Sequence, residues 1–226
     1  MIRYTFLDEI PVIFLDRPHR AHAYTPEMLT DLSKAISLSE EHSVCIISST
    51  GEKHFCSGAD MDSLQVRKAE DGLRLSSQRI FDQIAISSTI FIGAIQGPAI
   101  AGGFELALAC DLRVAHPQAY FSLPEVSLGL IPSAGGCTRL ARLLGESIAK
   151  GVVLGGQKID AVSAERWGLV HKISSEPLET AKLWAEEIKQ KNRLALHVAK
   201  TVLNNPSLQA ERLGESILYE RKSRNP

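Results

Sequence analysis

Residues 89–111 read TIFIGAIQGPAIAGGFELALACD, and this stretch decides the fold. No charged residue occurs from Gln83 through Phe104, so the run is long enough to raise the question of a membrane span. However, Gly97 and Pro98 divide the run into two short pieces, and this pair is typical of a tight turn. We therefore predict a buried strand over residues 89–96, then a turn, then a helix that begins near Gly102.

Short apolar runs alternate with helical patterns on both sides of this unit. Residues 2–6 alternate in polarity and residues 11–15 form a compact apolar run, which predicts two strands joined by a tight turn. Residues 25–27 (TPE) supply an N-cap, a first-turn proline and an acid at a helix start. The alternation predicts an α/β fold with crossover helices. Further strands are expected over residues 44–47, 112–115, 119–121 and 169–173, and further helices around residues 73–84, 138–144, 147–154 and 161–167.

After Pro177 the sequence shows only helical patterns. We therefore predict an α/β core over residues 1–174 and a helical C-terminal region over residues 175–226. The last helices carry more apolar side chains than one intramolecular face can hide, which predicts that the chain forms a homo-oligomer. These side chains include Leu183, Trp184, Leu203, Leu213, Ile217 and Leu218.

The composition is that of an ordinary globular chain of 226 residues, with 44% hydrophobic and 23% charged residues. The net charge is −1, and this balance argues against a nucleic-acid partner. The four cysteines lack the spacing of a zinc or redox site, and the seven histidines lack metal-ligand spacing, so we expect no metal. Asp8 and Glu9 interrupt any signal-peptide core, and we expect a cytoplasmic protein with reduced cysteines and no membrane association.

Three segments place glycine and small residues beside a carboxylate. Such turns leave backbone N–H groups free, and two facing turns can donate to one oxygen, as an oxyanion hole requires. Each feature also has an ordinary explanation, since Gly102 and Gly103 would allow close packing and Glu125 would be a solvated surface residue. No phosphate-binding loop and no Gly-x-Ser-x-Gly elbow occurs in the sequence. The segments are residues 56–61 (CSGADM), 97–105 (GPAIAGGFE) and 123–136 (LPEVSLGLIPSAGG).

Five motifs in a fixed order give a more specific indication. They are residues 17–23 (RPHRAHA), 54–61 (HFCSGADM), 101–107 (AGGFELA), 110–111 (CD) and 124–132 (PEVSLGLIP), and residues 155–161 (GGQKIDA) add a further match. In this order the chain resembles the enoyl-CoA hydratase/isomerase (crotonase) family from about residue 1 to residue 219. The resemblance implies a crotonase-like spiral core of ββα units with a C-terminal helical region, and an acyl-CoA thioester as the substrate.

The resemblance also implies roles for individual residues. The backbone N–H groups of Ala59 and Gly102 would hold the thioester oxygen, and Glu105 and Glu125 would be the catalytic carboxylates. Members of the family that keep both carboxylates tend to be hydratases, so we expect water to add across the 2,3 double bond of a 2-enoyl-CoA. We assign Glu105 as the base that orients water and Glu125 as the proton donor to the α carbon. The residues expected along the path of CoA are Arg20, Ala21, Ala23, Ser57, Gly58, Asp60 and Met61.

By the same resemblance we expect no cofactor beyond the CoA of the substrate, and a trimer or a dimer of trimers. The sequence departs from the family at three places. His22 stands where asparagine is usual, Ser133 stands where glycine is usual, and relatives continue beyond the position of Pro226. Ser133 would be strained if that position required a left-handed backbone.

Two other functions stay open from the sequence. One is a double-bond isomerase or another acyl-CoA transformation on the same scaffold. The other is a non-catalytic acyl-CoA-binding subunit, which would have no need of the paired Glu105 and Glu125.

Overall fold

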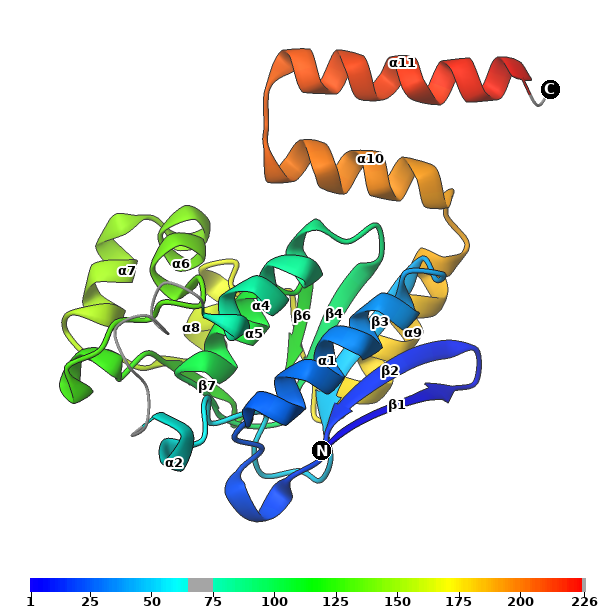
Figure 1. Ribbon diagram of the computed structural model, residues 1–226. Coiled ribbons are helices and arrows are strands. Elements are labelled where there is room, and N and C mark those ends of the chain that lie inside the picture. Colours follow the sequence, from blue (N-terminus) through cyan, green and yellow to red (C-terminus); the bar gives the residue numbers. More distant parts are fainter. Residues whose placement is uncertain (65–74, 225–226) are drawn as a thin grey trace.

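The computed structural model describes residues 1–64 and 75–224, and two β-sheets form its centre (Figure 1). The larger sheet has six strands in the order β1-β2-β3-β4-β6-β9. Its first two strands are antiparallel, and the remaining neighbours are parallel. These strands are β1 (Ile2–Leu7), β2 (Ile10–Leu15), β3 (Val44–Ser49), β4 (Ile90–Ile95), β6 (Leu112–Ala115) and β9 (Lys172–Ile173).

Helices connect the strands, and the predicted α/β class is confirmed. The predicted N-cap of the first helix is present, because the Thr25 side chain accepts a hydrogen bond from the Met28 N–H at 3.3 Å. Two 3₁₀ turns, η1 (Pro18–Arg20) and η2 (Glu125–Leu128), lie near the motifs singled out above. The helices are α1 (Pro26–Ser39), α2 (Met61–Leu64), α4 (Ser76–Ile86), α5 (Gly102–Ala109), α6 (Gly136–Leu144), α7 (Glu146–Val153), α8 (Ala161–Arg166), α9 (Pro177–Lys189), α10 (Arg193–Asn204) and α11 (Leu208–Arg224).

The strand predicted over residues 169–173 is wrong in its first part, and only Lys172 and Ile173 pair with β6. The N–H groups of Leu169 and Val170 instead both donate to the Ala164 carbonyl, at 2.8 and 3.0 Å, and so close the end of α8. The helix expected around residues 73–84 corresponds to α4, and Leu73 lies outside the described residues.

The large sheet is buried on both faces, as its continuous apolar runs indicate. Ile13 and Leu15 face one cluster with α1, α4 and α5, whereas Val12 and Phe14 face a second cluster. Helix α9 completes this second cluster with Ala181, Ala185 and Ile188. Thus α9, within the C-terminal region expected over residues 175–226, covers one face of the sheet, while α10 and α11 lie beyond it (Figure 1). The division of the chain at residue 174 stays a prediction.

A smaller sheet positions the start of α5. It consists of β5 (Ala99–Ile100), β7 (Tyr120–Ser122) and β8 (Ile159–Asp160) in that order. An isolated bridge joins Cys56 to Ala99, and only Ala101 separates β5 from α5. The loop at residues 55–60 and the first turn of α5 are therefore fixed against each other.

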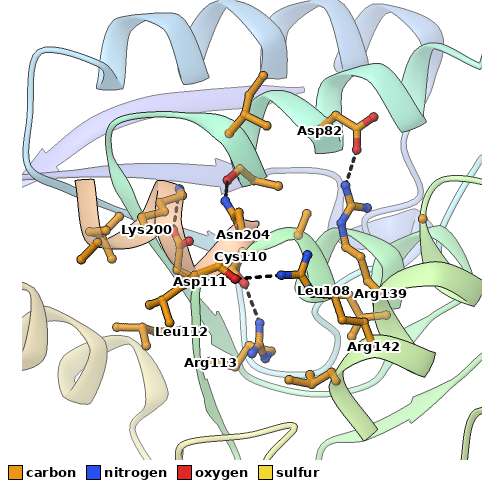
Figure 2. Close-up of a pocket in the computed structure, with 18 of the residues that line it drawn as sticks. Asp82, Leu108, Cys110, Asp111, Leu112, Arg113, Arg139, Arg142, Lys200 and Asn204 are labelled. Carbon is orange, nitrogen blue, oxygen red and sulfur yellow. Dashed lines mark hydrogen bonds and ion pairs between the residues drawn. The ribbon is translucent and has the colours of Figure 1, made fainter. Parts of the chain in front are cut away.

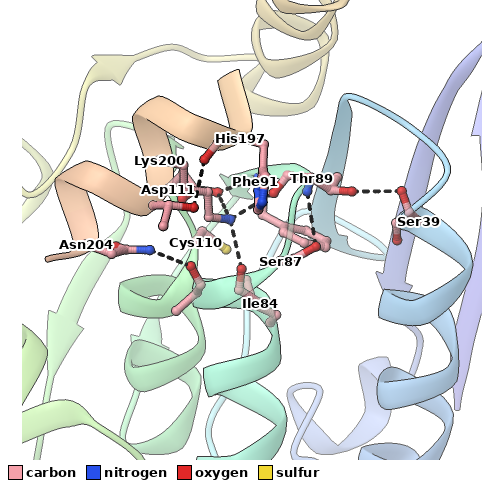
Figure 3. A network of polar contacts seen from close by, with 12 residues as sticks. Ser39, Ile84, Ser87, Thr89, Phe91, Cys110, Asp111, His197, Lys200 and Asn204 are labelled. Carbon is pink, nitrogen blue, oxygen red and sulfur yellow. Dashed lines mark hydrogen bonds and ion pairs between the residues drawn. The ribbon is translucent and has the colours of Figure 1, made fainter. Parts of the chain in front are cut away.

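One buried lysine fastens α10 to the core (Figure 3). The Lys200 ammonium donates to the Ile84 carbonyl at 3.0 Å, to the Thr89 carbonyl at 2.8 Å and to the Asp111 carboxylate at 2.8 Å. Asp111 also accepts the Phe91 N–H at 2.8 Å. Burial raises the pKa of Asp111, and the Lys200 charge opposes this rise. The buried Lys200 and the half-buried Asp111 thus have hydrogen-bond partners, as an ion pair shielded from solvent requires.

Candidate active site

The loop at residues 57–60 lies alongside the segment that follows η1. The Ser57 N–H donates to the Ala21 carbonyl at 3.0 Å, and the Tyr24 N–H donates to the Gly58 carbonyl at 2.8 Å. The Asp60 N–H returns a bond to the Tyr24 carbonyl at 2.9 Å. The structure therefore brings together two motifs that are more than thirty residues apart, as the expected path of CoA requires.

Glycine allows this loop to approach the start of α5 closely. A Cβ atom at Gly58 would lie 2.9 Å from the Gly102 nitrogen, and one at Gly103 would lie 2.0 Å from the Cys56 carbonyl oxygen. A Cβ atom at Gly102 would lie 2.0 Å from the Tyr24 hydroxyl. Because no larger residue fits these positions without a shift, the Gly-Gly pair serves close packing, and that packing sets the site.

The two N–H groups expected to form an oxyanion hole are both available. Within the described residues, neither the Ala59 N–H nor the Gly102 N–H donates a hydrogen bond to a protein acceptor. Gly102 is the first residue of α5, where an N–H has no partner inside the helix and the helix dipole favours negative charge. Ala101 enters the helix at φ 52°, an uncommon value for a residue other than glycine.

Glu105 lies buried in the first turn of α5, and backbone donors hold its carboxylate. Oε1 accepts the Ala134 N–H at 2.7 Å and the Gly136 N–H at 2.8 Å. A Cβ atom at Gly136 would lie 2.9 Å from this same oxygen, so a glycine is needed for the contact. Burial raises the pKa of Glu105, while the two N–H donors and the Arg139 charge oppose the rise.

Glu125 lies at the start of η2 and is buried in a different way. Its Oε2 atom has no hydrogen-bond partner in the described part of the chain. Burial, together with the negative charge of Glu105, raises the pKa of Glu125 to about 7. The two carboxylates therefore influence each other, and an unpartnered buried oxygen beside a second carboxylate is a feature of a functional site.

The residues expected along the path of CoA fall into three groups. Asp60 is buried and pairs with Arg17 at 2.5 Å, and the Arg17 hydrogen bond lowers the pKa of Asp60. This ion pair stabilises the loop, a role that the sequence did not indicate. Arg20 and Met61 instead expose their side chains to solvent. Ala21, Ala23, Ser57 and Gly58 lie in the two adjacent segments described above.

The two residues that differ from the usual family sequence, His22 and Ser133, are accommodated in different ways. His22 is buried at φ 56°, and its Nδ1 accepts the Arg17 N–H at 3.2 Å, so its ring packs inside the segment. Ser133 is not among the non-glycine residues with positive φ in the described ranges. The loop around Glu105 consequently does not require a left-handed residue at position 133, and the expected strain does not arise.

A cavity of about 920 Å³ lies among α4, the end of α5, α6, α9 and α10, and it borders the loop that holds Glu105 at Gly135 (Figure 2). Asp82, Arg139, Arg142 and Lys200 are among its lining residues, and Glu105 and Glu125 are not. The carboxylates and free N–H groups are the groups that can perform chemistry on a carbonyl substrate, so the candidate active site is theirs.

No helix in residues 1–64 and 75–224 is long and apolar enough to cross a membrane. In the same ranges, no group of three or more His, Cys, Asp or Glu side chains could hold a metal ion.

Comparison with known proteins identifies the family. The family model "Enoyl-CoA hydratase/isomerase" matches residues 6–221, and the chain belongs to this family. It is 40% identical over 197 residues to "Probable enoyl-CoA hydratase 2, mitochondrial" of Arabidopsis thaliana, a match that covers 84% of this chain and 65% of the plant protein. It is 32% identical over 203 residues to the short-chain-enoyl-CoA hydratase of Clostridium acetobutylicum, covering 87% and 78% of the two chains.

A solved structure agrees with the sequence comparison. The enoyl-CoA hydratase of Bacillus anthracis superposes with a TM-score of 0.89 and 31% identity, over 97% of this chain and 89% of that one. The predictions of a crotonase-like fold and of an enzyme of this family are confirmed. The chain spans somewhat less than two thirds of the length of the plant relative.

Proposed function

We propose that this protein is an enoyl-CoA hydratase that adds water across the 2,3 double bond of a 2-enoyl-CoA to give a 3-hydroxyacyl-CoA. One observation carries the proposal: the buried Glu105 raises the pKa of the buried Glu125, and Glu105 lies in the first turn of the helix that begins at Gly102. Among the described residues, the N–H groups of Gly102 and Ala59 have no protein acceptor. Hydration needs two proton-handling groups and a site for negative charge on the thioester oxygen. The names of the relatives point to the same reaction class.

Each group has one task in the proposed reaction. The Ala59 and Gly102 N–H groups bind the thioester oxygen and stabilise the enolate that forms on it. Glu105, held as a carboxylate by two N–H donors, takes a proton from water as the oxygen attacks the β carbon. Glu125, with a pKa of about 7, is partly protonated near neutral pH and gives its proton to the α carbon. Proton exchange with solvent then restores both groups.

The substrate would enter along residues 20–24 and 57–61, with the CoA moiety on Arg20, Ala21, Ala23, Ser57, Gly58, Asp60 and Met61. The adjacent backbone segments support this path. Because Asp60 is already paired with Arg17, we assign it the role of shaping the loop that CoA contacts. The proposal includes no cofactor beyond the CoA of the substrate, since the enolate is stabilised by the N–H groups.

The proposal extends to assembly and location. Large apolar side chains of α10 and α11 are exposed, among them Leu203 and Leu208, and this supports a homo-oligomer such as a trimer or a dimer of trimers. Cys45, Cys56 and Cys110 are free and buried, which supports a reducing compartment such as the cytoplasm. The name of the plant relative places that protein in the mitochondrion.

Crotonyl-CoA hydration, followed by the loss of enoyl-thioester absorbance, tests the function. We expect Glu105→Gln to lower the rate by roughly 10²–10⁴-fold while exchange of the α proton continues in part through Glu125. Glu125→Gln should abolish both hydration and double-bond migration. Binding of the substrate should change little in either variant, because the N–H donors belong to the backbone.

The same measurements separate the alternatives. If Glu105→Gln hydrates crotonyl-CoA at the wild-type rate, the hydratase assignment is wrong and a double-bond isomerase takes its place. If the wild-type protein binds crotonyl-CoA and changes neither the double bond nor the α proton, the protein is an acyl-CoA-binding subunit.

A further inference from the structure

The loop that holds Glu105 is itself held by an arginine that the proposed mechanism does not use. Arg139 lies in α6, and its Nη1 atom donates to the Ala134 carbonyl at 2.9 Å. The N–H of the same residue, Ala134, donates to Glu105 at 2.7 Å. The carbonyl of Ala134 thus contacts the guanidinium, and its N–H contacts the catalytic carboxylate.

Gly135 allows the guanidinium to lie close over the loop. A Cβ atom at this position would be 1.9 Å from Nη1 of Arg139, and Gly135 has φ 105°, a value that favours glycine. The Arg139 N–H also donates to the Gly135 carbonyl at 2.8 Å. Arg139 therefore contacts the loop through both its backbone and its side chain.

The other side of the guanidinium is paired with a different helix. Nη2 of Arg139 donates to Oδ1 of Asp82 in α4, and the arginine side chain is only 18% exposed (Figure 2). A planar guanidinium can hold two acceptors in a fixed geometry, which a lysine ammonium on a flexible stem does less well. The ion pair thus connects α4, α6 and the Glu105 loop.

Resting on the proposed function, we propose that Arg139, fixed by Asp82, is a positioning residue for Glu105. It holds the Ala134 carbonyl so that the Ala134 and Gly136 N–H groups stay directed at Oε1. Its charge also favours the ionised form of Glu105, the form that accepts the proton of water. The other titratable groups that face Glu105 are Glu125 in η2 and Cys137 in α6, and Asp82 lies behind the guanidinium.

Two substitutions separate the charge from the geometry. Arg139→Met removes both, and we expect kcat to fall on the order of 10²-fold with little change in KM. The acidic limb of its pH–rate profile should move to higher pH, because loss of the cation raises the pKa of Glu105. Arg139→Lys keeps the charge and loses the simultaneous hydrogen bonds to Ala134 and Asp82. Its kcat should therefore fall, while the acidic limb of its pH–rate profile stays in place.

The control is Arg142→Met, a matched substitution one turn further along α6. Arg142 donates to the Leu203 carbonyl and is not bonded to the Glu105 loop, so this variant should keep the wild-type kcat and pH limb. If Arg139→Met is poorly folded, Asp82→Asn serves instead. That variant loosens the guanidinium without removing the cation, and should lower kcat while its acidic limb does not move upward.

A measurement without substrate completes the test. The carboxyl ¹³C signal of Glu105, assigned by its loss in Glu105→Gln, should titrate at higher pH in Arg139→Met than in the wild-type protein. An unchanged titration together with an unchanged kcat overturns the positioning role even when wild-type hydration is normal. The proposed function fails by a different result, namely wild-type hydration by Glu105→Gln itself.

Discussion

Glu105 and Glu125 are the same residue type in two environments, and these environments support the different roles proposed for them. Two backbone N–H donors stabilise the charge of Glu105, whereas Oε2 of Glu125 has no partner among the described residues. Burial raises the pKa of both groups, and the Ala134 and Gly136 N–H donors limit the rise at Glu105. This difference supports the proposed division of roles, with Glu105 as the base and Glu125 as the acid.

This division has a consequence for stability. The pKa of Glu125 is raised from 4.5 to about 7, so protonation favours the folded state. The stabilisation is complete below pH 4.5 and is lost as the pH rises through about 7. At pH 8 we expect Glu125→Gln to increase the free energy of unfolding by up to about 3 kcal/mol, and at pH 4 to have little effect.

Urea unfolding at the two pH values measures this difference. Glu187→Gln in α9, at an exposed position, is the control and should change the free energy of unfolding by less than about 0.5 kcal/mol. If Glu125→Gln changes the free energy of unfolding equally at pH 4 and pH 8, then ionisation of Glu125 does not destabilise the folded state.

At the scale of elements, the contact between α5 and the loop at residues 55–60 leaves no room for a larger residue at Gly103. Gly103→Ala would place a Cβ atom 2.0 Å from the Cys56 carbonyl oxygen, so the helix must move away from the loop. We expect a loss of about 1–3 kcal/mol in unfolding free energy. The displacement also separates the Gly102 and Ala59 N–H groups, and hydration should fall on the order of 10²-fold.

The matched control for this prediction is Gly151→Ala in α7. A Cβ atom there meets only the flexible end of Gln157, at 3.0 Å, and alanine is the better helix former. This variant should stabilise the protein by about 0.5–1 kcal/mol and leave hydration unchanged. Thermal unfolding and the crotonyl-CoA assay measure both variants. Equal stability and equal hydration rates in Gly103→Ala and Gly151→Ala would contradict the role of Gly103 in close packing.

Local patterns were sufficient to predict most elements, because the hairpin, the Thr25 cap and the buried strands have signals within a few residues. The strand expected at residues 169–173 is shorter than predicted, since hydrogen bonds to Ala164 compete with strand pairing. At the site, resemblance indicated Glu105 and Glu125. Nothing in the sequence indicated that Arg17 would pair with Asp60 or Arg139 with Asp82, because such pairs join segments 43 and 57 residues apart.

At the scale of the whole molecule, the pair of helices α10 and α11 exposes apolar side chains that no other described part of the chain covers. Leu213 and Ile217 are 58% and 52% exposed. We expect light scattering at micromolar concentration to give a mass above that of a monomer, because burying this surface between copies removes it from water. The double variant Leu213→Glu with Ile217→Glu should shift the mass toward the monomer.

Leu154→Glu is the control for this experiment, since Leu154 is 70% exposed and lies outside the two helices. It should leave the mass unchanged. A monomeric wild-type protein would contradict the prediction, and a loss of mass in the Leu154 variant would move the contact surface to another part of the molecule.

The anchor of α10 also leads us to expect an order of events in folding. The Lys200 ammonium is 116, 111 and 89 residues away in sequence from its partners Ile84, Thr89 and Asp111. We expect these partners to come together only after β4 and the turn between α5 and β6 have formed, and α10 to dock late. In native-state hydrogen exchange, the amides of α10 should therefore open at lower free energy than those of β3 and β4, as one cooperative unit with α11.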